Sequence, residues 1–334
     1  MRFIKTYWLE MLMVIPLFAY IIGFTLLPIL TNIKASFIDQ RFGRRSDILA
    51  SKIADITYDL EHAADSEEKT VYEQELADAT LALERLRQSP YAGWSLSNYH
   101  KLFTDRSFLQ AIFNTLAITL LGLSLQAVLA MAIALVLTRP LHGKSVFRTV
   151  VLTPLGIPTI VSATIMTYIF DTAGYLNAIL YRLGLLAEAP IDWAQGGWLS
   201  IAMVVFADTW KVLPLMVLLF IAGLEAIPRS VHEASQIDGS PPLYKFFTVT
   251  LPLMKPYITI ALILRAIDAF RIFELPLILA GTETTPLIST FTYSEYARQN
   301  YNLSAASGTI LTGLILLFVF TYLYIVERER EPHA

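Results

Sequence analysis

The 334-residue sequence contains no cysteine and only five histidines. Without cysteine there can be no disulfide, no thiolate nucleophile and no cysteine-ligated zinc or iron–sulfur centre. The histidines lack the paired HxxxH spacing of a metal site; they are His62, His100, His142, His232 and His333. The net charge of −3 also lacks the basic excess typical of nucleic-acid-binding proteins. We therefore expect no metal site, no redox chemistry and no nucleic-acid partner.

Charged residues are scarce as well. They make up 16% of the chain and hydrophobic residues 55%, against about 25% and about 45–50% in an ordinary soluble domain. The mean hydropathy is +0.55. Apolar runs recur from Trp8 to Val326, so the pattern is not that of a signal peptide or a single anchor on a soluble domain. The composition predicts an all-α integral membrane protein with lipid as a partner.

Six stretches are long enough to cross a bilayer, which needs about 20 apolar residues in a helix. They lie at about residues 10–33, 109–138, 148–170, 198–223, 255–280 and 304–326. The second stretch exceeds one crossing, so we expect part of it to tilt or to extend beyond the lipid.

The positions of Lys and Arg predict the orientation. With a cytoplasmic N-terminus, the short outside loops contain only Arg182 and Arg298. The inside segments then contain Arg2, Lys5, Arg139, Lys144, Arg148, Arg229, Lys245, Lys255, Arg328 and Arg330. We expect both termini to be cytoplasmic.

A charged segment interrupts the apolar pattern between Arg44 and Gln88. Its apolar residues recur at helical spacing, which predicts an extracytoplasmic helical hairpin that turns near residues 65–68. Charge runs of this kind are usually solvated faces, so a spacer is one interpretation. A docking surface for an extracytoplasmic partner is the other.

The segment between the fourth and fifth stretches has the signals of a helix-turn-helix at the membrane surface. Ser230 is suited to cap a short helix, with Glu233 three residues later as in a capping box. Gly239 can take the left-handed conformation that ends such a helix, and Pro241 suits the first turn of the next one. Leu251-Pro252 is expected to precede the next membrane span.

This loop, residues 229–252, resembles the EAA loop of ABC importer permeases. That pattern has Glu-Ala-Ala, a Gly four residues after the last Ala, nine residues, and then Ile-x-Leu-Pro. Here Glu233-Ala234-Ser235, Gly239 and Val249-Thr250-Leu251-Pro252 keep all the spacings, with Ser235 and Val249 as departures. Asp238 before the glycine is also typical.

The resemblance covers most of the chain outside the charged insert and is to the carbohydrate-uptake branch that contains the maltose and glycerol-phosphate transporters. It is found at Ser95–Tyr99, Leu102-Phe103, Asn114-Thr115, Ala222–Pro228 and Ala269–Glu274. A Gly-Gly-Pro that is common after the fifth span is replaced by Gly281-Thr-Glu-Thr-Thr-Pro286.

The resemblance implies a transport subunit that is not itself an enzyme and binds no cofactor. Its implied partners are a second homologous permease, two ATPase subunits that use ATP and Mg, an extracytoplasmic solute-binding protein and a sugar-like solute. In this chain, Gly143-Lys144-Ser145 ends like a Walker A motif, but Thr138 stands where that motif needs a glycine. ATP must therefore be handled by a partner.

The implied organisation has four parts. They are an N-terminal segment with the first span (1–34), an extracytoplasmic loop with the insert (35–107), a core of five spans (108–327) and a cytoplasmic tail (328–334). In the core, the resemblance implies that the helix around Glu233 to Asp238 docks on an ATPase. Ala234 would allow close approach, Glu233 would offer a carboxylate for pairing, and Gly239 would fix the turn.

Four ionisable residues in the fifth stretch alternate in sign every three residues: Arg265, Asp268, Arg271 and Glu274. One interpretation is an i,i+3 ion-pair ladder. The other is that one or two of them line the translocation path, since ionisable groups at membrane depth face a bundle interior or a watery cavity. Asp208, Trp210 and Lys211 in the fourth stretch are further candidates for the path, with Trp210 able to stack on a sugar ring.

Two alternatives stay open at this point. The first is an ABC permease for a solute such as a polyamine, phosphate or an amino acid. The second is a secondary transporter, which would need coupling-ion sites and often has inverted repeats.

Overall fold

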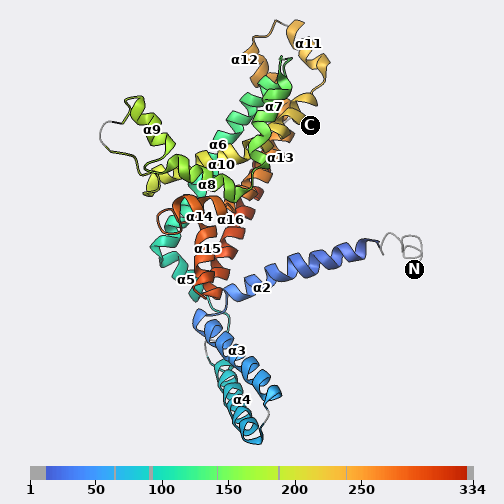
Figure 1. Ribbon diagram of the computed structural model, residues 1–334. Coiled ribbons are helices and arrows are strands. Elements are labelled where there is room, and N and C mark those ends of the chain that lie inside the picture. Colours follow the sequence, from blue (N-terminus) through green and yellow to red (C-terminus); the bar gives the residue numbers. More distant parts are fainter. Residues whose placement is uncertain are drawn as a thin grey trace, which may run out of the picture. The chain divides into compact units, whose positions relative to one another are not determined.

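The computed structural model describes residues 13–63, 65–89, 93–140, 142–186, 189–237 and 239–328. The regular elements in this part of the chain are helices, joined by turns and loops, and one isolated β-bridge links Ile38 and Trp94. Figure 1 labels the elements. The chain forms two compact units, one of residues up to 106 together with 291–310 and the other of residues 107–290 and from 311 onward. The helices are η1 (Ile21–Leu26), α2 (Leu27–Ser36), α3 (Gln40–His62), α4 (Ser66–Arg87), α5 (Ser97–Thr104), α6 (Arg106–Leu137), α7 (Lys144–Leu152), η2 (Thr153–Gly156), α8 (Thr159–Phe170), α9 (Tyr175–Arg182), α10 (Gly197–Glu225), α11 (Arg229–Ile237), α12 (Pro242–Lys245), η3 (Phe246–Thr250), α13 (Leu251–Phe270), α14 (Glu274–Ala280), α15 (Ile288–Ala297) and α16 (Tyr301–Arg328).

The first unit contains the helical hairpin of the charged insert, formed by α3 and α4, which pack side by side (Figure 1). Its two ends are fastened together. The Asn98 amide donates to the carbonyls of Ser36 at 2.9 Å and Ile38 at 2.7 Å, and the Ser95 N–H donates to the Phe37 carbonyl at 2.7 Å. The predicted hairpin is therefore confirmed, with its break after His62.

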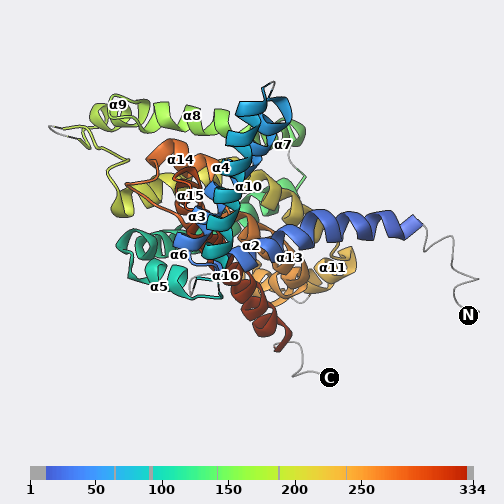
Figure 2. The ribbon, with the colours of Figure 1, turned by 90° about the horizontal axis from the view of Figure 1, so that it is seen from below.

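The second unit is built around α10. The N-terminal half of this helix, with Ile201, Val204 and Ala207, is buried in a core shared with α8 and α14. Its other half, with Val217 and Phe220, is buried in a second core shared with α6 and α13. Figure 2 shows α14 running beside α8, in agreement with the contacts between them.

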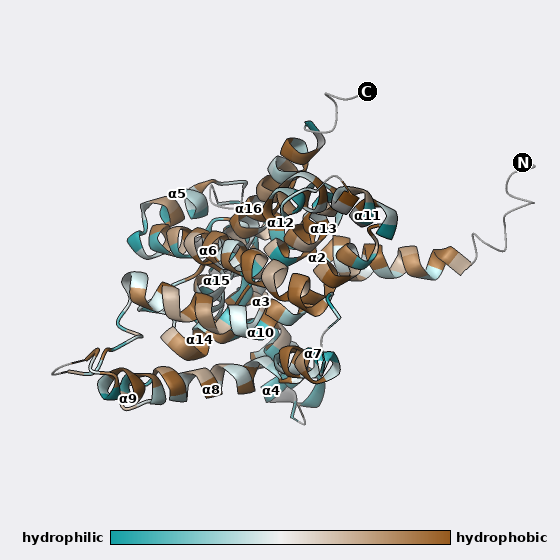
Figure 3. Cartoon of the chain, turned by 90° about the horizontal axis from the view of Figure 1, so that it is seen from above, coloured by the Kyte–Doolittle hydropathy of each residue, from teal (hydrophilic) through white to brown (hydrophobic). Residues whose placement is uncertain are grey.

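Within the described part of the chain, five helical runs are long and apolar enough to cross a membrane, and a bent pair brings the number to six if the pair is one span. The five are Met13–Ser36, Arg106–Leu137, Gly197–Glu225, Pro242–Phe270 and Tyr301–Val326. Figure 3 shows α2 and α16 coloured mainly as hydrophobic. The 32 residues of α6 make a helix about 48 Å long at 1.5 Å per residue, which exceeds the roughly 30 Å of a bilayer core.

The third predicted span is not a straight helix. It consists of two arms, Lys144–Gly156 and Thr159–Arg182, bent by 101° at the Ile157-Pro158 break, and we call this pair the bent span. Pro158 explains the break, because a proline has no N–H for the helical ladder and its ring clashes with the preceding turn.

The fifth predicted span, 255–280, is also wrong in its bounds. One helical run extends from Pro242 to Phe270, and the chain then leaves the helix before α14 begins at Glu274. Leu251-Pro252 therefore lies inside this run and does not precede it. The turn before Pro252 is the π-helical η3, a local widening that fits a proline without an N–H donor.

The packing of α10 against α13 depends on Gly223. A Cβ built on this glycine would lie 2.7 Å from Tyr257 Cγ, 2.8 Å from Tyr257 Cβ and 2.9 Å from the Met254 methyl. Small residues that let two helices approach this closely are a main source of helix association in lipid. Gly313, in α16, is a helical glycine whose added Cβ would meet nothing within 4 Å.

These two glycines predict opposite effects of the same substitution. Gly313→Ala should stabilise the protein by about 0.5–1 kcal/mol because alanine favours a helix. Gly223→Ala should destabilise it by about 1–3 kcal/mol through overpacking, since Tyr257 Cβ cannot swing away. Thermal unfolding of both variants in the same detergent measures the difference, and equal midpoints would contradict the close contact.

Candidate functional site

The loop 229–252 forms a short helix that stands at the end of α10. Figure 1 shows α11 and α12 at the same end of the second unit as the start of the Pro242–Phe270 run. Since α11 begins at Arg229, Ser230 lies in its first turn and not at the predicted N-cap. The next helix begins at Pro242, with Pro241 as its N-cap.

Gly239 ends this helix as the sequence predicts. Its φ of 64° is left-handed, and the Ser240 N–H donates to the Ser235 carbonyl at 3.3 Å. This is the six-to-one bond of a Schellman motif. Asp238 lies outside the described residues.

One face of the loop is fastened to the helix bundle. Ile227 is buried in the core of α6, α10 and α13, and Val231 and Phe246 pack against the same core. Ser235, which replaces the second alanine of the pattern, is also buried. The loop is therefore held to the end of α10 by side chains on both sides of its turn.

The opposite face of the loop is exposed. Glu233 and Ala234 are exposed, and Ile237 is 86% exposed. Leu243 and Phe247, beyond the turn, are exposed too. Exposed apolar side chains on the same short segment as an exposed carboxylate are typical of a surface that contacts a partner protein.

A second site lies at the middle of the second unit, where polar side chains of three helices meet. Asp208 of α10 and Arg265 of α13 form an ion pair, with only 8% and 6% of their side chains exposed. Gln126 of α6 joins them: its amide nitrogen donates to Asp208 Oδ2 at 2.9 Å, and its amide oxygen accepts from Arg265 Nε at 2.9 Å. Thr209 Oγ1 lies 3.4 Å from the same Gln126 nitrogen.

We call this arrangement the polar triad of Gln126, Asp208 and Arg265. It gives both buried charges hydrogen-bond partners. The carboxylate accepts two hydrogen bonds, and the guanidinium donates to an amide as well as to the carboxylate. Such satisfaction is needed because an unpaired charge in an apolar interior is very costly. Gln126 was not predicted from the sequence, although a single amide within the apolar run 116–137 is a signal of an interhelical contact.

The ion-pair ladder predicted for the fifth stretch has one rung. Arg271 pairs with Asp268 at 3.1 Å, and both side chains are more than half exposed. Arg265 pairs across helices instead, and Glu274 lies on a different helix, α14, where it is exposed. The helix end at Phe270 separates Glu274 from the ladder because the common axis ends there, and Arg265 is already paired with Asp208 of α10.

Two other predicted path residues have contacts with the protein itself. Trp210 packs, half-buried, against the core of α8, α10 and α14. The Lys211 ammonium contacts the carbonyls of Pro154, Leu155 and Ile157 at the break in the bent span. The structure therefore brings Asp208 and Arg265 together and directs Trp210 and Lys211 elsewhere.

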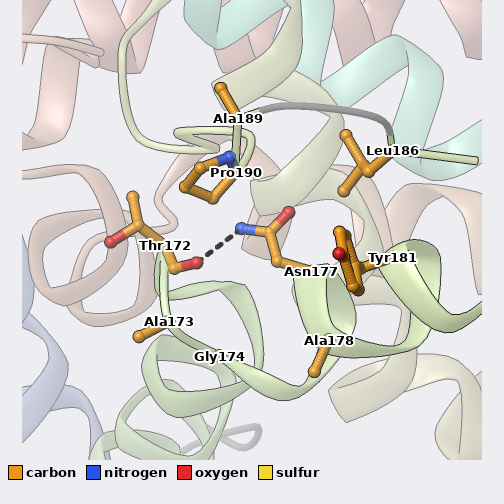
Figure 4. Close-up of a pocket in the computed structure, with 9 residues that line it drawn as sticks. All are labelled: Thr172, Ala173, Gly174, Asn177, Ala178, Tyr181, Leu186, Ala189 and Pro190. Atoms are coloured by element: carbon orange, nitrogen blue, oxygen red, sulfur yellow. Dashed lines mark hydrogen bonds between the residues drawn. The ribbon is translucent and has the colours of Figure 1, made fainter.

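A pocket of about 300 Å³ lies beside α9 and away from the polar triad (Figure 4). Asn177 fills part of it, and its amide donates to the Thr172 carbonyl at 3.1 Å and to the Ile191 carbonyl at 2.8 Å. The Asn177 oxygen accepts from the Ile191 N–H at 3.2 Å. These bonds tie the turn after α8 to the chain beyond α9, which is a structural role. Among the described residues, no three His, Asp or Glu are grouped to hold a metal.

The fold defines a multi-pass helical membrane protein. Its loop 229–252 is packed against the end of α10, and its polar triad joins α6, α10 and α13. Residues 126–331 match the family described as the binding-protein-dependent transport system inner membrane component, and the chain belongs to this family. It is thus a permease of the inner membrane and a transport subunit.

The chain is similar to several permeases that are named for the sugars they transport. The trehalose/maltose transport system permease protein MalF of Thermococcus litoralis is 35% identical over 73% of this chain and 82% of the relative. The trehalose transport system permease protein SugA of Mycobacterium tuberculosis is 35% identical over 68% of this chain and 73% of its own length. A chain of the crystal structure of a bacterial alginate ABC transporter, in complex with an alginate-bound periplasmic protein, has a TM-score of 0.74 at 18% identity, covering 99% of this chain and 98% of that chain.

The polar triad predicts strongly coupled substitutions. Arg265→Met should destabilise the protein by about 3–5 kcal/mol, because it leaves the Asp208 carboxylate buried without its partner. Adding Asp208→Leu should restore part of that loss, since replacing both charges by apolar groups removes the unpaired ion. Unfolding of the two single variants and the double variant gives the coupling free energy. Losses that simply add would contradict the pairing.

Proposed function

We propose that this chain is the permease subunit of an ATP-driven importer for a sugar or sugar-like solute and that α11 couples it to an ATPase. The observation that carries the proposal is α11 itself, which is fastened to the bundle on one face and exposed on the other. Membership of the permease family and the sugar permeases among its relatives support it.

In this proposal both termini and the loop 229–252 are cytoplasmic, and the α3–α4 hairpin is extracytoplasmic. The excess of Lys and Arg in the segments assigned to the inside supports this orientation.

The proposed assembly has a second permease, two ATPase subunits that use ATP and Mg, and a solute-binding protein outside. The lack of a complete Walker A motif in this sequence supports a separate ATPase. The exposed charges of Asp268, Arg271 and Glu274 support a second permease, because charged side chains at the end of a span are unfavourable against lipid.

Coupling would run along α10. This helix is continuous from Gly197 to Glu225, and α11 begins four residues later, at Arg229. Ile227 and Val231 pack α11 against the core that α10 shares with α13. A displacement of α11 by a closing ATPase is therefore transmitted to packed helices and not to a loose loop.

The substrate path would pass the polar triad. Asp208 and Arg265 can exchange their mutual hydrogen bonds for the hydroxyl groups of a polyol. The names of the relatives support a polyhydroxylated solute over a polyamine or an amino acid.

Substitutions in the loop test the coupling. Nothing lies within 4 Å of a Cβ added to Gly239, so its substitutions act through the backbone alone. Gly239→Asn should transport normally, because Asn tolerates the left-handed conformation, and Gly239→Ala should strain the turn by about 1–2 kcal/mol. Gly239→Pro should lose transport at least ten-fold, because proline cannot adopt a positive φ.

Glu233→Lys should likewise abolish uptake and ATPase copurification while the chain inserts normally. Glu283→Lys, a charge reversal at an exposed position outside the loop, is its matched control. Retained ATP-driven uptake in both Gly239→Pro and Glu233→Lys would count against the coupling role.

The solute class is tested by uptake of labelled compounds in cells that express the complete transporter. We expect accumulation of a disaccharide such as trehalose or maltose, and its loss when ATP is depleted. Accumulation of a polyamine, phosphate or an amino acid in its place would overturn the sugar assignment while leaving the importer class intact.

A further inference from the structure

The break in the bent span interrupts the hydrogen bonds of the helix backbone. The last carbonyl groups of the Lys144–Gly156 arm have no N–H group from a following helical turn to accept from. Pro158 has no N–H to donate to the Pro154 carbonyl, which accepts only a tighter backbone bond, from the Ile157 N–H at 3.3 Å. In a membrane-spanning segment such groups need partners within the protein, since lipid provides none.

Lys211 provides those partners. Its ammonium donates to the Pro154 carbonyl at 3.0 Å, lies 3.4 Å from the Leu155 carbonyl and also contacts the Ile157 carbonyl. An ammonium has three donors, so three carbonyls account for its hydrogen-bonding capacity. It also lies at the C-terminal end of a helix, where the helix dipole favours a positive charge.

Lys211 has no carboxylate partner among the described residues. Asp208, one turn earlier on α10, is instead paired with Arg265 and Gln126. The two opposite charges on α10 therefore make separate connections, Asp208 to α13 and α6 and Lys211 to the break. This separation distinguishes Lys211 from a lysine that only balances a nearby acid.

We propose that Lys211 is a positioning residue for transport: its ammonium holds the break of the bent span to α10, so that the angle between the two arms is set from the helix that leads into α11. This role rests on the proposed function, because it assumes that α10 moves with the loop 229–252. The break is then a fixed bend and not a free hinge. When α10 moves, the break moves with it, and its carbonyls keep their hydrogen bonds to Lys211.

The alternative is that the Lys211 side chain only occupies space and that its charge does not affect the angle of the bend. The two cases differ in a distance within the bent span, which does not depend on transport. Because the chain has no cysteine, spin labels attach only where cysteines are introduced. Val150 on the first arm is 65% exposed and Tyr168 on the second arm is 68% exposed, so Val150→Cys and Tyr168→Cys report the bend.

The labelled full-length chain, with its copurifying subunits in lipid nanodiscs, is compared in four backgrounds: unchanged, Lys211→Met, Lys211→Arg and Lys144→Met. Lys211→Met should broaden the distance distribution at least two-fold, and Lys211→Arg should keep it narrow because the guanidinium retains charge and donors. Lys144→Met removes a lysine at the other end of the same arm and should have no effect. A second label pair at Phe206 and Leu264, on α10 and α13, should not change in any background.

An unchanged distribution in Lys211→Met would overturn the proposal, and so would an equal broadening in Lys144→Met or at the second pair. If Lys211→Met does not assemble, Lys211→Gln replaces it, since it keeps a donor but no charge and should broaden the distribution to an intermediate width. Uptake should fall at least ten-fold in Lys211→Met and recover in Lys211→Arg. A broadened bend with no effect on uptake would overturn the transport role, whereas failure of the unchanged chain to transport any sugar would refute the proposed function and leave the bend measurement standing.

Discussion

The absence of hydrogen-bonding partners in lipid is the constraint on which the second unit depends. Two groups of buried contacts in this unit show how other helices supply those partners. Asp208, Arg265 and Gln126 satisfy one another across α10, α13 and α6, and Lys211 satisfies the break in the bent span. Burial of apolar surface does little to hold helices together when the solvent is equally apolar, so these polar contacts and close approaches such as Gly223 on Tyr257 define the packing.

Five of the six predicted spans are long apolar helices in the described part of the chain, and the sixth corresponds to the bent pair; length and hydropathy are properties of a single segment, so the sequence could predict them. It did not predict where a span bends or ends. The third stretch is apolar through Ile157-Pro158, and Pro154, Gly156 and Pro158 were the signals of a break. The end of α13 at Phe270 has no glycine or proline to mark it, so Ala269–Glu274 seemed to continue the helix. Gly239, by contrast, stands alone between two polar segments, and its left-handed conformation was predictable from that position.

The candidate sites show the same division between local and tertiary information. Glu233, Ala234 and Gly239 follow a spacing within one loop and could be found from the sequence. Asp208 and Arg265 could be found one at a time as ionisable residues in apolar runs, but not as partners, because their pairing joins two helices 57 residues apart in the chain. The predicted ladder failed for this reason: it searched for partners along one helix. Gln126 carries no charge and so gave a weaker signal than the two residues that it connects.

A buried ion pair is an unexpected way to join helices if stability alone matters, since an apolar contact of the same size would serve as well or better. Its value lies in the difference between paired and unpaired states, because a displaced charge in an apolar interior is heavily penalised. In a permease that moves between arrangements of its helices, such contacts permit only the arrangements in which each buried charge has a partner. That partner can be a neighbouring side chain, a set of backbone carbonyls or the hydroxyl groups of a solute. The central helix α10 has two such contacts three residues apart and leads directly toward α11. On the proposed path, a polyol could therefore replace Arg265 as a hydrogen-bond partner of Asp208, and the solute would then favour the arrangement in which it makes these bonds.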